Sequence, residues 1–400
     1  MDPKLTEIRI IAKEHTDEEM NNQMASKSNF ECIIIGCGIA GASLAYFLSE
    51  RGMTDILILE REEQPGYHAT GRAAGVLAEL DPIPSVSQLK ILSAPFLRNP
   101  PGGFSENPIL RQSGILILSK GELWEALQQV VTVLREEGVV VEMLSQEEVI
   151  AKIPVVLPEN FDGALLLTQD GHLDVHELLW SYLRHARRRG AKLCCNEEVE
   201  GIKVDHGKCS GVITSVGEYQ SRWIVNASGA WAGNIRKLAG LSPVQLTPYR
   251  RTIITFAAPE GLDVKNWPLT ADESHRLYFS PESSGLLASP MDEEPMEPCD
   301  ARPDDLVVAQ TIELLKQLTP RLVPQSIQRK WAGLRTFAPD HAMVIGEDPL
   351  LKGFFWLSGQ GGAGIETSPA VGQIASDLIL DGRTNLMDIQ PISPERFQKT

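Results

Sequence analysis

The sequence has 400 residues, 42% apolar and 22% charged, a composition typical of a globular protein with two or three domains. Its formal net charge of −16, with no basic stripe, argues against binding to nucleic acid or to an anionic membrane surface. The six cysteines show neither CxxC nor metal-ligand spacing, so we expect reduced thiols, a cytoplasmic location and no metal site.

The first 48 residues contain a polar segment followed by an uncharged apolar run. Residues 1–28 are polar and charged, which predicts a flexible extension. No short apolar stretch follows a basic start, so we expect no secretion signal. The uncharged run 32–48 is slightly short for a membrane span and contains three glycines, so we expect a strand, a turn and a helix there and no transmembrane segment.

The first structured unit begins at Phe30. An apolar strand at 31–35, a glycine-rich turn at 36–41, a helix ending at Gly52 and a second apolar strand at 55–60 follow one another. This order predicts a βαβ unit with parallel strands and a right-handed crossover.

Later segments alternate between helical and strand patterns. The proline-rich region 61–114 is expected to contain loops. Amphipathic spacing, a Ser145 N-cap and Asp174 near a helix start predict three helices. The expected helices are 121–138, 145–154, 173–190 and a later one near 307–318; the expected strands are 114–118, 192–195, 199–205, 209–215, 222–229, 247–259 and 276–290. Residues 353–380 close the chain as a strand, a glycine-rich turn and a helix.

This order predicts an α/β (α+β) fold with two interleaved parts. Residues 29–112, 172–240 and 331–395 are expected to form a discontinuous Rossmann-type domain that binds a dinucleotide. Residues 113–171 and 241–330 are expected to form a second, mainly antiparallel β-sheet domain that binds the substrate.

The most specific motif is the dinucleotide fingerprint Gly36-x-Gly38-x-x-Gly41, followed by Glu60 at the end of the second strand. Gly36 allows a tight turn, Gly38 lets a pyrophosphate approach the backbone, and Gly41 lets the helix pack against the strand. The helix N-terminus then faces the phosphates. Glu60 is suited to accept hydrogen bonds from a ribose diol, and its charge argues against a 2′-phosphate and hence against NADP. The fingerprint alone leaves FAD and NAD open.

Three further segments bear on that choice: GYHATGRAAG at 66–75, VNASGAWA at 225–232 and SGQGGAGI at 358–365. With the fingerprint, they resemble the D-amino acid oxidase (DAO) family of FAD enzymes over residues 30–392. Within that family the chain is most similar to the D-arginine dehydrogenases.

The resemblance implies FAD as the cofactor. Arg72 and Ala73 stand where some relatives have a flavin-linked histidine, and no cysteine precedes Gln360, so we expect noncovalent binding. His68 lies nearby, and a structural role in its loop is favoured. The implied cofactor-binding residues are Gly36, Gly38, Ile39, Ala40, Gly41, Glu60, Arg61, Thr70, Arg72, Ala73, Ala74, Val199, Ala227, Ser228, Gly229, Gly361, Gly362, Gly364 and Ile365. The last glycines are expected to bring a second helix N-terminus, with its dipole, to the flavin.

The implied reaction is hydride transfer from a substrate Cα to flavin N5, giving an imine that hydrolyses to a 2-keto acid and ammonia. Arg335 matches the family's carboxylate-binding arginine, and Tyr278 a tyrosine that hydrogen-bonds the same carboxylate. Arg251 is a further carboxylate candidate with Arg250 as its competitor, because planar guanidinium groups bind carboxylates bidentately. No side chain stands out as a general base.

The substrate loop departs from the D-arginine dehydrogenases. Val76 and Asp81 replace a pocket histidine and tyrosine, and Ile115 stands near the acid expected to pair with a guanidinium side chain. Glu79 or Asp81 are substitutes for that acid. A D-amino acid or related amine is therefore the expected substrate, with a 2-hydroxy acid dehydrogenase or a flavin-binding protein without amine oxidation as alternatives. The electron acceptor is left open between oxygen, a quinone and another protein.

Overall fold

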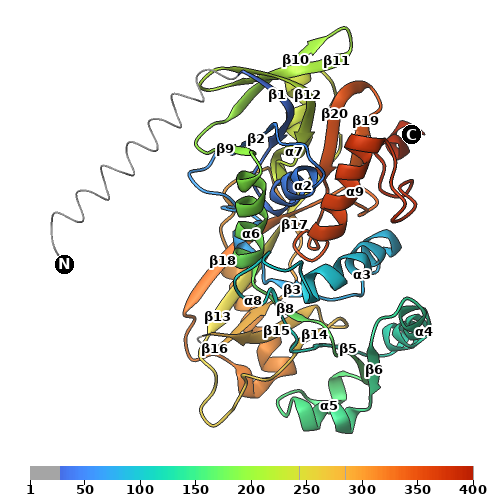
Figure 1. Cartoon of the computed structure of the whole chain (residues 1–400). Helices are drawn as coiled ribbons and strands as arrows, with labels where there is room; N and C mark the ends of the chain where they lie inside the picture. Colours follow the sequence, from blue (N-terminus) through green and yellow to red (C-terminus); the bar gives the residue numbers. More distant parts are fainter. Residues whose placement is uncertain (1–27, 243, 284, 400) are drawn as a thin grey trace, which may run out of the picture.

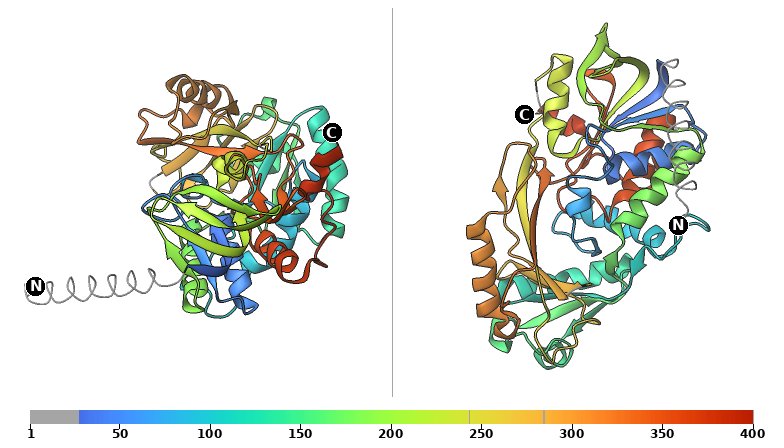
Figure 2. Two further views of the ribbon diagram at one scale, coloured as in Figure 1. Left: turned by 90° about the horizontal axis from the view of Figure 1, so that it is seen from above. Right: turned by 90° about the vertical axis from the view of Figure 1, so that its left-hand side faces the viewer.

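A computed structural model describes residues 28–399 except 243 and 284. The predicted extension therefore lies, apart from Ser28, outside the described residues. The described chain forms two lobes, each built on a large β-sheet, stacked along the long axis of the molecule (Figure 1 and the right-hand view of Figure 2).

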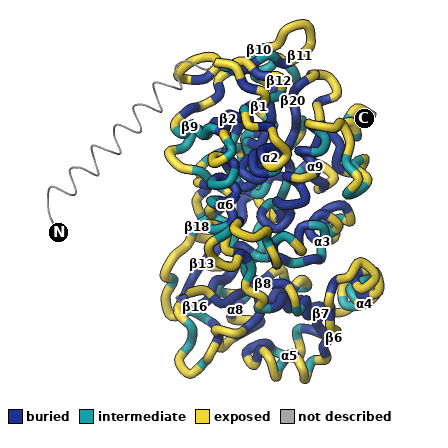
Figure 3. Tube along the Cα trace, in the orientation of Figure 1, coloured by how far each residue is buried: buried dark blue, intermediate teal, exposed yellow. Residues whose placement is uncertain are grey.

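One lobe contains an eight-stranded sheet with the order β10-β11-β20-β12-β1-β2-β9, in which β19 also pairs with β20. At its centre β1 pairs in parallel with β12 and β2, as the βαβ pattern predicts. The strands are β1 (Asn29–Ile35), β2 (Ile56–Leu59), β9 (Lys192–Cys194), β10 (Val199–Asp205), β11 (Lys208–Thr214), β12 (Glu218–Asn226), β19 (Val344–Asp348) and β20 (Leu351–Ser358). The central strands are buried because they consist of short apolar runs (Figure 3).

Helices pack beside these strands. They are α2 (Ile39–Glu50), α3 (Pro84–Arg98), α6 (Val175–Arg188), α7 (Ala232–Ile235) and α9 (Ser368–Asp381). The packing of α2 against α9 is close, since a Cβ at Gly372 would lie 2.0 Å from the Ser43 hydroxyl oxygen. Asp174 caps α6 by accepting a hydrogen bond from the Glu177 N–H, as its position predicts.

The other lobe contains a nine-stranded sheet with the order β17-β13-β16-β15-β14-β5-β7-β6, in which β18 also pairs with β13. Its strands are β5 (Ile115–Ser119), β6 (Val141–Leu144), β7 (Gly163–Leu167), β13 (Thr247–Phe256), β14 (Leu269–Asp272), β15 (Leu277–Glu282), β16 (Gly285–Ser289), β17 (Glu294–Pro295) and β18 (Arg329–Phe337). All pairings except that of β14 with β5 are antiparallel, which confirms the predicted second sheet.

Three helices flank this sheet: α4 (Glu122–Glu136), α5 (Gln146–Lys152) and α8 (Asp305–Leu318). The Ser145 N-cap forms a capping box with Glu148 at the start of α5. A small sheet joins the lobes through β3 (Val76–Leu77), β8 (Gly171–Leu173) and β4 (Leu110–Arg111). Among the described helices, none is long and apolar enough to cross a bilayer.

The structure differs from the sequence expectations in two places. The region expected to contain loops also contains α3, which was not predicted and in which Pro84 occupies the first turn and Pro95 lies in the last turns. Proline is tolerated in a first helical turn because its missing N–H has no partner there, so Pro84 marks the start of a helix. Residues 331–337 were assigned to the Rossmann-type domain, but β18 pairs with β13 from Thr247 to Thr255 and belongs to the nine-stranded sheet.

Candidate active site

The turn between β1 and α2 has the geometry that a dinucleotide fingerprint needs. Gly36 has a φ of +102°, and a Cβ there would lie 2.6 Å from the Ala227 carbonyl oxygen. A Cβ at Gly41 would lie 2.1 Å from the Gly36 carbonyl oxygen. Gly38 is the N-cap of α2, where only the Thr70 hydroxyl, at 3.2 Å, would approach an added Cβ. The helix N-terminus therefore faces open space, as a bound pyrophosphate requires.

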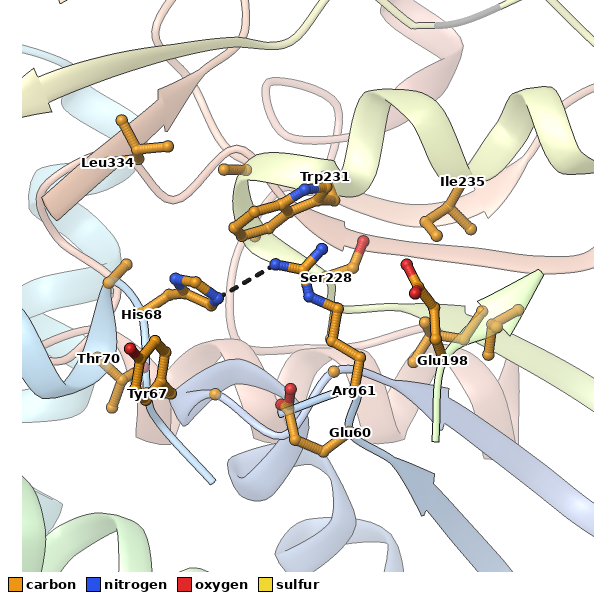
Figure 4. A pocket seen from close by; sticks show the side chains of 18 of the residues that line it. Glu60, Arg61, Tyr67, His68, Thr70, Glu198, Ser228, Trp231, Ile235 and Leu334 are labelled. Carbon is orange, nitrogen blue, oxygen red and sulfur yellow. Dashed lines mark hydrogen bonds between the residues drawn. The ribbon is translucent and has the colours of Figure 1, made fainter. Parts of the chain in front are cut away.

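This turn borders a cavity of about 520 Å³, which we call the Rossmann cavity (Figure 4). Three separate chain segments line it, around residues 35–72, 197–238 and 299–334. Gly333 and Leu334 of β18, which the sequence did not predict, lie on its wall. So do ten of the residues predicted to bind the cofactor: Gly36, Gly38, Glu60, Arg61, Thr70, Arg72, Val199, Ala227, Ser228 and Gly229.

Glu60 lies at the end of β2 with its carboxylate already oriented. One oxygen accepts a hydrogen bond from the Cys37 N–H at 2.8 Å and the other from the Glu62 N–H at 3.0 Å. Each carboxylate oxygen has a second lone pair, so Glu60 can still accept hydrogen bonds from a diol. This arrangement fits the ribose-binding role that the sequence predicts.

A cluster that the sequence did not predict lies on the same wall (Figure 4). The Arg61 guanidinium lies 3.8 Å from the centre of the Trp231 ring and 3.2 Å from Nε2 of His68. The same His68 nitrogen lies 2.8 Å from the Glu62 carboxylate. Burial opposes the charge on Glu62, but hydrogen bonds from His68 and Arg61 outweigh it and lower the pKa of Glu62. His68, expected to be structural, thus both orders its loop and lines the cavity.

A second hollow of about 160 Å³, the interface cavity, lies between the two large sheets. It shares Gly38, Thr70, Ala227 and Gly333 with the Rossmann cavity, so the two hollows adjoin. Further predicted residues on its wall are Ile39, Ala40, Ala73, Ala74, Arg251, Arg335, Gly361, Gly362, Gly364 and Ile365. Gly41 lines neither hollow, because its role is to let α2 approach the Gly36 turn.

Strand register decides between the two candidate arginines of β13. Arg251 pairs with Gly333 and Tyr249 pairs with Arg335, so Arg251 and Arg335 lie on one face of the sheet. Both line the interface cavity. Arg250 alternates to the other face and forms ion pairs with Glu294 and Asp304. The sequence could not make this choice, because it does not reveal the register.

Arg335 is the unusual cation of the site. It is half-buried, and its guanidinium group has no hydrogen-bond or ion-pair partner among the described residues. A Cβ at Gly362 would lie 2.7 Å from one of its terminal nitrogens. The glycine loop therefore packs directly against the guanidinium group, and the Gly361 N–H donates to the Thr336 carbonyl oxygen at 2.9 Å.

The glycine loop differs from the prediction in one respect. We expected Gly361, Gly362 and Gly364 to open the last helix, but α9 begins at Ser368. The glycines instead form the turn that connects β20 to the helix and lines the interface cavity. Their small size serves the approach to Arg335 and Phe337, since a Cβ at Gly361 would lie 2.1 Å from the Phe337 ring.

Tyr278 and Arg72 differ in their relation to the two cavities. Tyr278 lines neither; it is buried, and its hydroxyl has no hydrogen-bond partner among the described residues. Arg72 lines both hollows but directs its guanidinium to the Ala301 and Ala332 carbonyl oxygens, at 3.0 and 3.2 Å, and to Asp300.

The loop acids proposed as partners for a cationic substrate are already paired. Glu79 binds Arg98, and Asp81 lies 2.9 Å from the Lys90 ammonium. Neither lines the interface cavity, whereas Val76 does. Ile115 is buried in β5. The described part of the cavity therefore has no free acid for a guanidinium side chain, since Glu366 on its wall pairs with Lys90 at 3.0 Å.

A Rossmann unit whose cavity adjoins a second hollow containing an unpaired guanidinium defines a dinucleotide-dependent oxidoreductase. Among the described residues, no group of three or more histidine, cysteine or acidic side chains is placed to bind a metal ion.

Comparison with known proteins identifies the family. A profile described as "FAD dependent oxidoreductase" (DAO) matches residues 31–378, and the chain belongs to this family. FAD-dependent oxidoreductase domain-containing protein 1 of Bos taurus is 26% identical over 423 residues, covering 92% of this chain and 84% of that protein. Mitochondrial sarcosine dehydrogenase of Homo sapiens is 27% identical over 377 residues, covering 89% of this chain and 40% of that protein.

The fold is likewise similar to a solved structure. L-proline dehydrogenase from P. horikoshii matches with a TM-score of 0.84 at 22% identity, covering 93% of this chain and 99% of that chain. The family and FAD as cofactor are thus confirmed. These relatives are an FAD-dependent oxidoreductase domain-containing protein and a sarcosine dehydrogenase, and they do not support the narrower resemblance to the D-arginine dehydrogenases.

The residues present fit FAD. The Gly36–Gly41 turn presents the N-terminus of α2 to the Rossmann cavity, Glu60 has free acceptor capacity, and the Rossmann cavity adjoins the interface cavity where Arg335 lies. The dinucleotide part would lie along the first hollow, and the redox-active end would face the second.

Proposed function

We propose that this protein oxidises an α-amino acid or an N-alkylated relative with an uncharged side chain. FAD, when bound, supplies the chemistry by accepting a hydride from the substrate Cα, and the resulting imine hydrolyses in water. Arg335 would bind the substrate carboxylate, with Arg251 on the wall of the same cavity and Tyr278 as a further candidate ligand. The two adjoining hollows would hold cofactor and substrate side by side.

The observation that carries this proposal is the unpaired Arg335 guanidinium on the wall of the interface cavity. A buried or half-buried cation without a partner is costly, so an anionic ligand is expected there. A carboxylate suits it because a guanidinium group can donate two parallel hydrogen bonds. The similarity to sarcosine dehydrogenase supports an amine beside that carboxylate.

The test is anaerobic reduction of the FAD-loaded protein. Glycine, N-methylglycine, both enantiomers of alanine and of lactate would each be added while the visible flavin absorbance is followed. We expect at least one amine to bleach the flavin. Bleaching by lactate alone would favour a 2-hydroxy acid dehydrogenase, and no bleaching by any compound would favour a binding role.

Two variants on β18 assign the carboxylate site. Arg335→Lys keeps the charge but loses the bidentate geometry, so KM should rise by about 10- to 100-fold, corresponding to roughly 1.5–3 kcal/mol. Arg329→Lys is the matched control, because Arg329 is exposed at the start of the same strand. Equal effects of the two changes would contradict the role of Arg335.

Noncovalent attachment, the electron acceptor and a cytoplasmic location remain predictions. Acid precipitation of the protein should leave all yellow colour in the supernatant if FAD is not covalently bound. Reoxidation of the reduced protein by oxygen, by a quinone or by neither would distinguish the three kinds of acceptor.

A further inference from the structure

The charges around the interface cavity are unequally compensated. Arg72 pairs with Asp300, and Lys90 pairs with Glu366 and Asp81. Arg335 alone among the cavity-lining cations lacks an ion-pair partner within the described residues. A cavity with one uncompensated positive charge is suited to a ligand with one negative charge.

Arg251 is compensated from outside the cavity. Its Nη2 lies 3.0 Å from the Glu293 carboxylate, and its Nε donates to the Asp292 carbonyl oxygen at 2.9 Å. Burial and the charge of Arg335 lower the pKa of Arg251 to about 10, although Glu293 and Asp292 oppose this shift. Glu293 therefore stabilises a second cation that lies close to the first.

Glu293 is held in this position by the neighbouring chain. Its other carboxylate oxygen lies 3.0 Å from Arg276, and both residues line a surface hollow on the outer side. The adjacent Asp292 carboxylate accepts hydrogen bonds from the Thr252 N–H at 2.7 Å and from the Thr252 hydroxyl at 2.9 Å. Since Asp292 is anchored to β13, Glu293 remains opposite Arg251.

We infer that Glu293 is a specificity-determining residue that restricts the substrate to a single carboxylate by occupying Arg251. The inference rests on the proposed function, because it assigns the α-carboxylate to Arg335. A substrate with a second carboxylate would have to share Arg251 with Glu293, and like charges at such short range repel. Amines with an uncharged N-substituent are therefore favoured over N-carboxymethyl amines.

Binding of unreactive ligands tests the charge argument separately from catalysis. Methoxyacetate and oxydiacetate replace the amine of N-methylglycine and of N-(carboxymethyl)glycine by an ether oxygen, so neither has an amine to oxidise. Their Kd values for the FAD-loaded protein would be measured by calorimetry. We expect the wild type to bind methoxyacetate at least about tenfold more tightly than oxydiacetate.

Glu293→Gln should remove or reverse this preference, because Arg251 becomes free to bind the second carboxylate of oxydiacetate. The ratio of the Kd values for oxydiacetate and methoxyacetate should change by about tenfold or more. Glu294→Gln is the matched control, since Glu294 pairs with Arg250, which does not line the cavity. A wild-type ratio near one, failure of the wild type to bind either ether, or an unchanged ratio in Glu293→Gln would each overturn the inference.

Reduction by the corresponding amines separates this inference from the proposed function. If the two ethers show the expected Kd ratio but neither N-methylglycine nor N-(carboxymethyl)glycine bleaches the flavin, the role of Glu293 is supported. The proposed oxidation of these amines then fails. If N-methylglycine reduces the flavin but the ethers bind equally, the proposed function holds and the role of Glu293 fails.

Discussion

The contact between Gly362 and Arg335 gives the sharpest prediction. In Gly362→Ala, the new Cβ would lie 2.7 Å from a terminal nitrogen of Arg335, about 0.7 Å short of the 3.4 Å at which ordinary van der Waals contact begins. Gly362 does not have a positive φ, so the backbone accepts alanine without strain. The guanidinium group is the end of a flexible side chain and is therefore the part that moves.

A displacement of this size changes the binding of a carboxylate. A charge-assisted hydrogen bond contributes roughly 1.5–3 kcal/mol and depends steeply on distance and angle, so loss of one or both bonds corresponds to about a 10- to 100-fold rise in the Kd for methoxyacetate. FAD content should stay unchanged, because the Gly36 turn and Glu60 are untouched.

The assay combines calorimetric titration with the flavin absorbance per protein. Gly364→Ala is the control, since its Cβ would lie 2.8 Å from the Gln360 side-chain oxygen and not from Arg335. Gly362→Ala with wild-type affinity for methoxyacetate would refute the reasoning, and so would an equal loss in both variants.

Three further outcomes follow from other parts of the structure. Gly36→Ala should purify without FAD, because its Cβ would lie 2.6 Å from the Ala227 carbonyl oxygen at a φ of +102°. Gly52→Ala is the control for backbone strain, since Gly52 has a φ of +92° and nothing lies within 4 Å of an added Cβ. Retained FAD in Gly36→Ala would contradict the proposed fit of FAD to this turn. Tyr278→Phe removes a buried hydroxyl that has no partner among the described residues, so thermal stability should be unchanged or higher. KM should rise several-fold if the hydroxyl binds the substrate. A clear loss of thermal stability would contradict the absence of a partner for this hydroxyl. Burial and, second, the charge of Glu79 raise the pKa of Asp170 to about 8. Protonation of this carboxyl therefore stabilises the folded state. The stabilisation is complete below the unfolded pKa of about 4 and is lost as the pH rises through about 8. The free energy of unfolding, measured in urea at several pH values, should fall over this range and fall less in Asp170→Asn, and identical slopes would exclude Asp170 as the cause.

The sequence predicted the parts of the fold that short-range patterns determine. The βαβ unit, the capped helices and the apolar strands follow from local periodicity and end residues. The helix α3 was missed because prolines are frequent in the region around it, although Pro84 lies where a helix tolerates it. The assignment of β18 was wrong because its partner β13 lies far away along the chain.

The same division applies to the site. Glycine motifs indicated the cofactor turn, since their spacing reflects backbone geometry. The partners of Arg251 could not be predicted, because Glu293 reaches it from a loop whose position depends on the tertiary fold. The pairing of Glu79 and Asp81 with Arg98 and Lys90 was equally invisible, so these acids were considered as substrate ligands.

The interleaved arrangement of the two sheets also affects how the protein is made. The Rossmann cavity takes wall residues from β1 near the start of the chain and from β18, and the interface cavity is completed only by residues as late as Glu366. A ribosome therefore releases the glycine-rich turn long before the opposite walls exist. Stable capture of FAD must wait until the chain is almost fully synthesised, so cofactor loading is coupled to the last stage of folding.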